Sequence, residues 1–177
     1  MPSLDGKGLA DLLDGKLPWQ QLKGVMSATK DPSRFALYLQ VLQERAAFDD
    51  KILLPLAEHL FVVARDGQRV VICDCGYVFG PVDRNWKRET RILVRDSEEL
   101  LEEIYDQYHR CDPQWMELRE YICPGCWSLL EVEAVPPGYP VLFDFKPDID
   151  AFYENFLGRP APDRATCDIF SLLLELN

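Results

Sequence analysis

Long apolar runs are missing from this sequence, and so is a concentration of positive charge. No apolar stretch approaches the roughly 20 residues that a membrane-spanning helix needs. The first seven residues lack the charged-then-apolar pattern of a secretory signal, so we expect a cytoplasmic protein. Thirty acidic residues against 19 basic ones give a net charge of -11. Because nucleic acid phosphates repel such a chain, we expect neither nucleic acid nor a membrane as a partner.

Motifs for catalysis are also lacking. The sequence has no glycine-rich phosphate loop, no nucleophile elbow and no His-Glu zinc-protease motif. The acidic pairs Asp49-Asp50 and Asp148-x-Asp150 are compatible with acid-base work or a divalent cation, but helix capping and solvated turns explain them at least as well. We therefore expect no catalytic residue and no residue that binds an organic cofactor.

The first part of the chain, residues 1–58, has helical patterning. A short apolar stripe of leucines at positions 9, 12 and 13 is followed by Gly15, a residue typical of helix C-termini. A second helix is indicated where Asp31 can cap and Pro32 fits the first helical position. Phe35 and the apolar residues after it then recur at helical spacing. We expect a helical N-terminal segment.

From residue 59 to residue 136 the pattern is mainly that of strands. Two β-rich runs, 61–64 and 70–73, flank the turn signal Asp66-Gly67 and predict a hairpin. Further strands are predicted at 91–94, 118–122 and 130–134. Between the first two of these, Asp96 or Ser97 caps a predicted helix whose apolar face runs from Leu100 to Tyr108. Prolines then introduce residues 137–177, which we expect to form an extended C-terminal arm with one short helix around 149–157. The predicted fold class is α+β.

Four of the six cysteines form two close pairs, each at the end of a predicted strand and beside a glycine. They are Cys73-x-Cys75 and Cys123-x-x-Cys126. In a reducing cytoplasm such pairs indicate a metal site rather than disulfides. Two thiolate pairs on two hairpins are typical of a zinc ribbon, and four thiolates leave no coordination position for an activated water. We expect one structural zinc ion, held in an antiparallel, zinc-ribbon-like β module.

Other interpretations remain open for individual residues. The cysteines are also compatible with free thiols, or with a redox pair at Cys123 and Cys126. His109 and Cys111 form a rival ligand pair. Cys167 is expected to pack as a small residue, and His59 to lie at the surface. A set of aromatic residues is interpreted as core or subunit interface: Phe143, Phe145, Phe152, Tyr153 and Phe156.

Seven short segments, taken in order, resemble a known family, the small gamma subunit of acetone carboxylase and acetophenone carboxylase. The resemblance runs from about Leu9 to Pro162. It is carried by residues 31–35 (DPSRF), 43–45 (QER), 49–56 (DDKILLPL), 73–76 (CDCG), 85–87 (NWK), 119–126 (REYICPGC) and 144–149 (DFKPDI). Three departures from the acetone-type pattern favour the acetophenone branch: Trp127, Cys111 and a longer tail after Asp163.

The resemblance implies an accessory, non-catalytic subunit of an ATP-dependent ketone carboxylase. In such complexes ATP and bicarbonate are used by large, hydantoinase-like subunits, which would be the partners of this chain. The family's zinc ligands correspond to Cys73, Cys75, Cys123 and Cys126. The alternative is a free-standing zinc-ribbon adaptor for protein-protein interaction. The apolar tail 169–177 follows a proline-containing linker and is expected to contact the large subunits.

Overall fold

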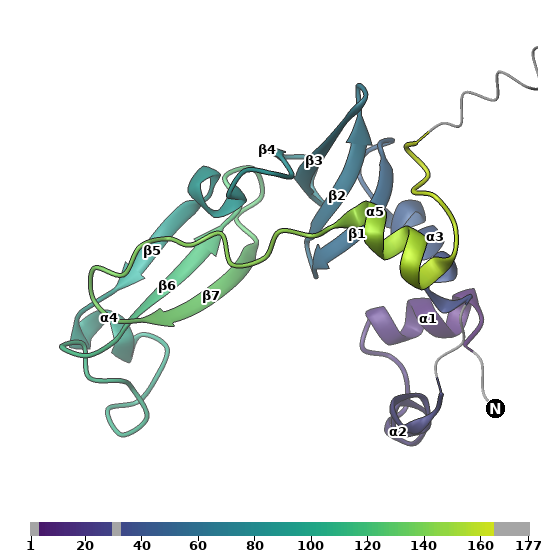
Figure 1. The fold of residues 1–177 in the computed structure, drawn as a ribbon. Coiled ribbons are helices and arrows are strands. Elements are labelled where there is room, and N and C mark those ends of the chain that lie inside the picture. The colour runs from purple at the N-terminus through teal and green to yellow at the C-terminus, as the bar shows by residue number, and fades with distance from the viewer. Residues whose placement is uncertain (1–3, 30–32, 165–177) are drawn as a thin grey trace, which may run out of the picture. The chain divides into compact units, whose positions relative to one another are not determined.

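The computed structural model describes residues 4–29 and 33–164 (Figure 1). The chain divides into two compact units, residues 1–147 and residues 148–177, which are described separately below. Within the described residues, no helix is long and apolar enough to cross a membrane.

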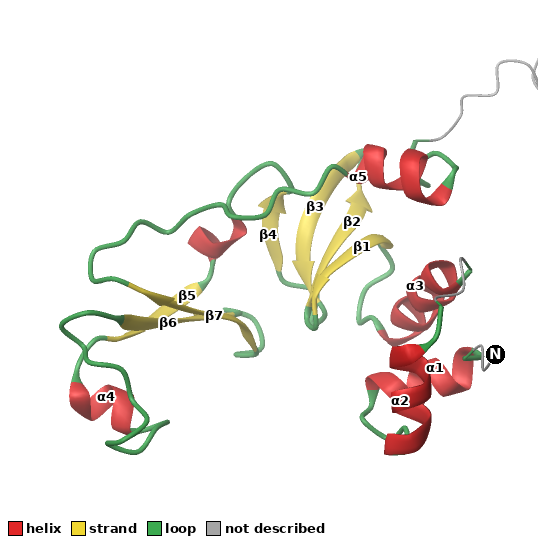
Figure 2. Ribbon diagram, turned by 60° about the horizontal axis from the view of Figure 1, so that its bottom comes forward, coloured by secondary structure: helices red, strands yellow, loops and turns green. Residues whose placement is uncertain are grey.

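The first unit contains helices, red in Figure 2, and two antiparallel sheets, whose strands are yellow. The predicted α+β class is therefore confirmed. The helices are α1 (Gly6–Leu13), α2 (Trp19–Ser27), α3 (Arg34–Arg45) and α4 (Glu98–Glu102), with the 3-10 helix η1 (Trp86–Glu89). The first sheet has the order β1 (Lys51–Ala57), β2 (Leu60–Arg65), β3 (Gln68–Cys73) and β4 (Val78–Pro81). The second has the order β5 (Arg91–Arg95), β6 (Glu117–Ile122) and β7 (Leu129–Val135).

The N-terminal helices follow the predicted patterns. The Asp5 carboxylate caps α1 by accepting a 2.7 Å hydrogen bond from the Gly8 N–H. The helix ends before Gly15, whose positive φ of 66° suits a chain reversal. Asp31 and Pro32, the predicted start of the next helix, lie outside the described residues, while α3 itself begins at Arg34.

The apolar side chains of these helices cover one face of the first sheet. That face carries Ile52, Phe61, Val63, Val70 and Ile72. Against it pack residues from α1, α3 and the chain after α3: Leu13, Tyr38, Leu39, Leu42, Ala46 and Phe48. Burial of apolar area on this face stabilises the packing of the helices against the sheet.

The predicted hairpin is the centre of the first sheet. β2 and β3 pair antiparallel, with Arg65 opposite Gln68 and Val63 opposite Val70. Asp66 and Gly67 form the two-residue turn with φ values of 49° and 73°. Positive φ at both positions is the geometry of a type I′ turn, which matches the twist of the strands.

One strand lies where we expected only helical structure. β1 occupies the end of the 1–58 segment and pairs with β2, placing Ile52 opposite Val63. The segment is a short apolar run interrupted by Pro55, and such a run does not distinguish strand from helix by periodicity alone. Pairing with β2, which lies outside residues 1–58, makes this run a strand.

The predicted helix after Ser97 is much shorter than expected. Ser97 does cap it, accepting a 3.3 Å hydrogen bond from the Leu100 N–H, but α4 ends at Glu102. The Leu100 carbonyl accepts a 2.8 Å hydrogen bond from Arg95 Nη1 instead of continuing the helical ladder. Only Leu101 of the short helix is buried. The remainder of the predicted apolar face, from Ile104 to Tyr108, forms turns.

The second unit contains the short helix predicted around 149–157. It consists of α5 (Ile149–Ala151) followed by the π-helical turn η2 (Phe152–Phe156). The Asp148 carboxylate caps it, accepting a 3.0 Å hydrogen bond from the Ala151 N–H. Tyr153 is buried, whereas Phe156 is 81% exposed. Cys167 and the apolar tail 169–177 lie outside the described residues.

Candidate metal centre

The first cysteine pair lies in the turn between β3 and β4. Cys73 is the last residue of β3, and its N–H donates to the Tyr77 carbonyl at 2.8 Å. The Gly76 N–H donates to the Cys73 carbonyl at 2.9 Å, closing the turn. Gly76 has a φ of 92°, which residues with a Cβ rarely adopt. The glycine therefore allows the chain to fold back with both sulfurs on the same side.

The second pair lies in the turn between β6 and β7. The Trp127 N–H donates to the Cys123 carbonyl at 2.9 Å, and the Cys123 N–H donates to the Ser128 carbonyl at 2.9 Å. Trp127 takes the left-handed conformation, with a φ of 66°. Its indole ring is stacked by the Arg91 guanidinium, whose carbon lies 4.7 Å from the ring centroid. This contact contributes to holding a bulky residue in a conformation that favours glycine.

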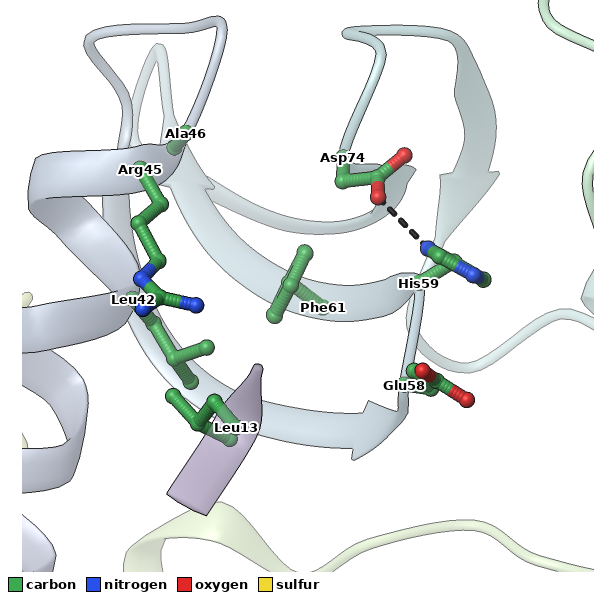
Figure 3. A pocket seen from close by; sticks show the side chains of 8 residues that line it. All are labelled: Leu13, Leu42, Arg45, Ala46, Glu58, His59, Phe61 and Asp74. Carbon is green, nitrogen blue, oxygen red and sulfur yellow. Dashed lines mark hydrogen bonds and ion pairs between the residues drawn. The ribbon is translucent and has the colours of Figure 1, made fainter. Parts of the chain in front are cut away.

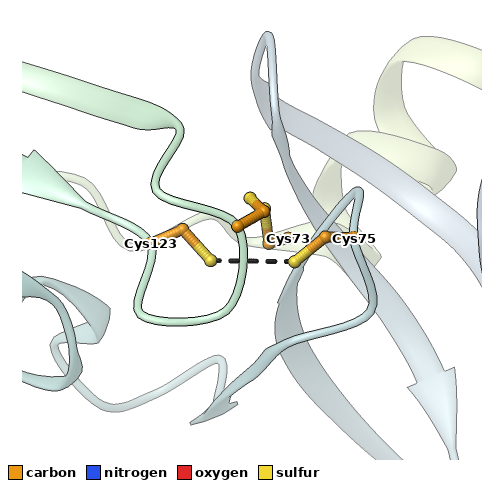
Figure 4. Close-up of side chains that lie close together, drawn as sticks. Cys73, Cys75 and Cys123 are labelled. Carbon is orange, nitrogen blue, oxygen red and sulfur yellow. Dashed lines mark hydrogen bonds between the residues drawn. The ribbon is translucent and has the colours of Figure 1, made fainter.

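The two turns bring the four sulfurs together, although they belong to different sheets. All four ligand atoms lie within 4.8 Å of one another. The sulfurs of Cys73 and Cys126 are 3.7 Å apart, and those of Cys75 and Cys123 are 3.8 Å apart. Figure 4 marks the contact between Cys75 and Cys123 with a dashed line. Zinc–sulfur bonds of about 2.3 Å in a regular tetrahedron require sulfurs about 3.8 Å apart. A disulfide requires about 2.05 Å. The arrangement fits a tetrahedral metal ion.

Gly125 makes room for this arrangement. Its N–H donates to the Cys123 sulfur at 3.4 Å. A Cβ at this position would lie 3.3 Å from the Cys75 sulfur and 3.1 Å from the Tyr77 Cβ. The second turn therefore approaches the first so closely that only a residue without a side chain fits without movement of the neighbouring atoms.

The four thiols differ in their surroundings. Cys73 and Cys123 are fully buried, whereas Cys75 and Cys126 are exposed. In the metal-free chain, burial raises the pKa of Cys73 and of Cys75. The Ser128 hydroxyl, 3.2 Å from the Cys126 sulfur, lowers the pKa of Cys126 to about 7. A metal must displace the proton from each thiol before it binds as a thiolate.

Asp74, the residue between the first two cysteines, also lines a pocket, whose side chains Figure 3 shows. Asp74 Oδ1 accepts a 3.2 Å hydrogen bond from the Cys73 thiol, and Asp74 Oδ2 lies 2.6 Å from His59 Nδ1. The pocket is lined by Leu13, Leu42, Arg45, Ala46, Glu58, His59, Phe61 and Asp74. His59 is half-buried and its ring has a hydrogen-bond partner, because the pairing of β2 with β3 places it opposite Asp74.

The rival ligand pair is not part of the cluster. His109 Nδ1 lies 2.8 Å from the Asp106 carboxylate in an exposed turn. The Cys111 thiol donates to the Met116 carbonyl at 3.6 Å. Among the described residues, the two groups with metal-binding geometry contain neither of them.

The second such group consists of three carboxylates, and a lysine occupies its centre. Lys87 is 1% exposed, and its ammonium nitrogen lies 2.7 Å from Glu131, 3.0 Å from Asp144 and within hydrogen-bond distance of Glu133. Burial alone would lower the pKa of Lys87, but the hydrogen bonds to the three carboxylates outweigh it and raise the pKa. We interpret the group as an ion cluster and not as a cation site.

Sequence reasoning missed this cluster. Tyr121 completes it by donating a 2.6 Å hydrogen bond to Glu133. The residues come from η1, β6, β7 and the segment after β7, so no local spacing indicates them. The alternation of Glu131 and Glu133 along β7 was the available signal, but it resembles an ordinary solvent-facing strand.

Comparison with known proteins supplies the remaining evidence. A family model described as the acetone carboxylase gamma subunit matches residues 46–157, a range that contains all four clustered cysteines. The chain is 45% identical over 159 residues to the acetone carboxylase gamma subunit of Xanthobacter autotrophicus. That match covers 89% of this chain and 95% of the relative.

A second relative is the acetophenone carboxylase beta subunit of Aromatoleum aromaticum. It is 29% identical over 80 residues, which are 44% of this chain and 62% of that protein. This chain is therefore more similar to the acetone carboxylase subunit, in identity and in coverage, than to the acetophenone carboxylase subunit. The comparison does not support the acetophenone branch, which Trp127, Cys111 and the longer tail favoured. The relative from that branch is also named a beta rather than a gamma subunit.

Proposed function

The chain belongs to the acetone carboxylase gamma subunit family, and on this premise we propose that it is an accessory subunit of a multi-subunit, ATP-dependent ketone carboxylase. Its role in the proposal is structural: it carries one zinc ion and docks on larger subunits that use ATP and bicarbonate. The observation that carries the proposal is the match to 95% of a named carboxylase subunit.

The four clustered cysteines are the proposed zinc ligands. The sulfur–sulfur distances of 3.7 and 3.8 Å support this choice, as does the even division of thiols between the two turns. Zinc bound by four thiolates supplies a structural cross-link and has no open position for substrate. The link would tie the first sheet, through Cys73 and Cys75, to the second sheet, through Cys123 and Cys126.

The core around these cysteines supports a structural role. Cys73 and Cys123 belong to one buried cluster with Leu60, Val71, Phe79, Trp86 and Tyr121. The aromatic rings of Phe79, Trp86 and Tyr121 pack edge to face, with successive centroids 6.0 and 6.3 Å apart. A zinc ion at this point would complete a core that both sheets already share.

The test is reconstitution from purified subunits. Zinc per chain is measured by elemental analysis, and ketone-dependent ATP hydrolysis is measured with acetone and with acetophenone. We expect one zinc per chain, no hydrolysis by the isolated chain, and association with the large subunits. Ketone-dependent ATP hydrolysis by the pure chain would contradict the proposal. A chain that binds zinc but never associates with those subunits would favour the free-standing adaptor.

A further inference from the structure

The segment from Asp96 to Trp115 exposes apolar side chains that a protein surface seldom leaves in water. We name four of these residues the aromatic surface: Ile104, Tyr105, Tyr108 and Trp115. Their exposed fractions are 44%, 46%, 84% and 75%. Tyrosine and tryptophan are enriched at the centres of protein interfaces, where each buries a large area with few rotatable bonds. The sequence pattern predicted Ile104, Tyr105 and Tyr108 for a helix face, but the structure ends that helix at Glu102.

Hydrogen bonds and ion pairs within residues 96–115 order the segment that carries the aromatic surface. Arg110 reaches back to α4, with contacts of 2.8 Å to Glu98 and 3.1 Å to Glu102. The Asp106 carboxylate accepts a 2.9 Å hydrogen bond from the Tyr108 N–H, and Asp112 accepts one of 2.9 Å from the Gln114 N–H. A segment ordered in this way loses little conformational entropy on binding, which favours association.

The charge of the same segment determines which partner chemistry it fits. Residues 96–115 contain seven acidic residues and one basic residue, Arg110. Their net charge is -6, and the net charge of the whole chain is -11. The acidic residues are Asp96, Glu98, Glu99, Glu102, Glu103, Asp106 and Asp112. These acidic residues would repel nucleic acids and anionic membranes, and they would attract a basic protein surface.

We propose that residues 96–115 are the docking surface through which this chain binds a basic surface of a larger carboxylase subunit, with the aromatic side chains entering apolar pockets there. This inference rests on the proposed function. It goes further by assigning the contact to one segment, outside the cysteine cluster, and by giving the partner surface its charge.

The experiment measures binding of the full chain to the purified large subunits. The aromatic variant is Tyr108→Ser/Trp115→Ser, and its control is Trp19→Ser, because Trp19 of α2 is 63% exposed. The charge variant is Asp96→Asn/Glu99→Gln. Its control is Asp83→Asn/Glu89→Gln, which removes the same charge from exposed positions of another segment. Circular dichroism and zinc content verify that each variant is folded.

We expect the aromatic variant to bind about tenfold or more weakly, with the Trp19 control unchanged. The charge variant should associate severalfold more slowly than its control at low salt, and equally fast at high salt, because salt screens the steering field. If the wild-type chain binds and the aromatic variant binds equally well, the docking surface is overturned while the proposed function stands. If the wild-type chain does not bind at all, the proposed function fails.

Discussion

Replacing Lys87 by methionine is expected to destabilise the chain strongly. Methionine fills a similar volume but removes the ammonium group that contacts Glu131, Glu133 and Asp144, whose carboxylates lie within 4.8 Å of one another. Removing one partner of a buried ion pair costs about 3–5 kcal/mol. Since the Glu131 and Asp144 side chains are 32% and 55% exposed, water screens part of the loss. We therefore expect the free energy of unfolding to fall by about 3 kcal/mol.

Urea unfolding measures this loss, with zinc kept saturating so that metal content does not differ between proteins. Arg88→Met is the matched control, because Arg88 is the exposed neighbour of Lys87 in η1. The control should change the free energy of unfolding by less than about 0.5 kcal/mol. A loss below about 1 kcal/mol in the Lys87 variant would refute the reasoning, since it would mean that the carboxylates are well solvated without the lysine.

The pH dependence of the free energy of unfolding provides a second check on the Lys87 variant, and the direction of the change can be derived. Burial raises the pKa of Glu131 even in the wild-type chain. Lys87 opposes this shift, so without the ammonium the folded-state pKa of Glu131 rises further above its unfolded value. The folded state then prefers the protonated form of Glu131, and the variant loses stability as pH rises through that pKa. The difference from wild type should shrink on going from pH 8 to pH 5. The raised pKa of Lys87 keeps the wild-type lysine charged throughout this window.

Two further predictions concern the cysteine cluster. Cys123→Ser should lose zinc, and with it stabilisation on the order of 10 kcal/mol. Cys111→Ser should keep its full zinc content, which elemental analysis measures in both variants. Full zinc retention in the Cys123 variant would contradict the ligand assignment. Gly125→Ala should lower zinc affinity in a chelator competition and destabilise by about 1–3 kcal/mol, because its Cβ would crowd the Cys75 sulfur at 3.3 Å. Gly24→Ala is the control, since nothing lies within 4 Å of a Cβ there; equal affinities in the two variants would show that the turn relaxes freely.

Features determined by neighbouring residues were predictable from the sequence, and features determined by distant contacts were not. The hairpin around Asp66 and Gly67 follows from local turn chemistry. The turn at Cys73 and Cys75 depends on Gly76 in the same way, whereas in the second turn the left-handed residue is Trp127, which local turn chemistry does not indicate. The strand character of β1 depends on pairing with β2, and the end of α4 depends on Arg95 taking a helix carbonyl. Neither contact leaves a periodic signal in the sequence. For the same reason the partners of Lys87, 44 and 46 positions further along the chain, were not foreseen.

The even division of the cysteines between two sheets has a consequence for biosynthesis. Cys123 follows Cys75 by 48 positions, so the first turn leaves the ribosome complete while the second is still to be made. Except for β5 and β6, which residues 96–116 separate, neighbouring strands are joined by short hairpin turns that form quickly, whereas closing the 48-position loop carries a larger entropic cost. During that interval a nascent chain presents only two of the four cysteines of the proposed zinc site. A neighbouring chain on the same message presents an identical pair. Exchange of turns between such chains would give a metal-bridged dimer with each half of the ligand set from a different molecule. Rapid translation past residue 126 therefore favours a cluster whose four cysteines all come from one chain.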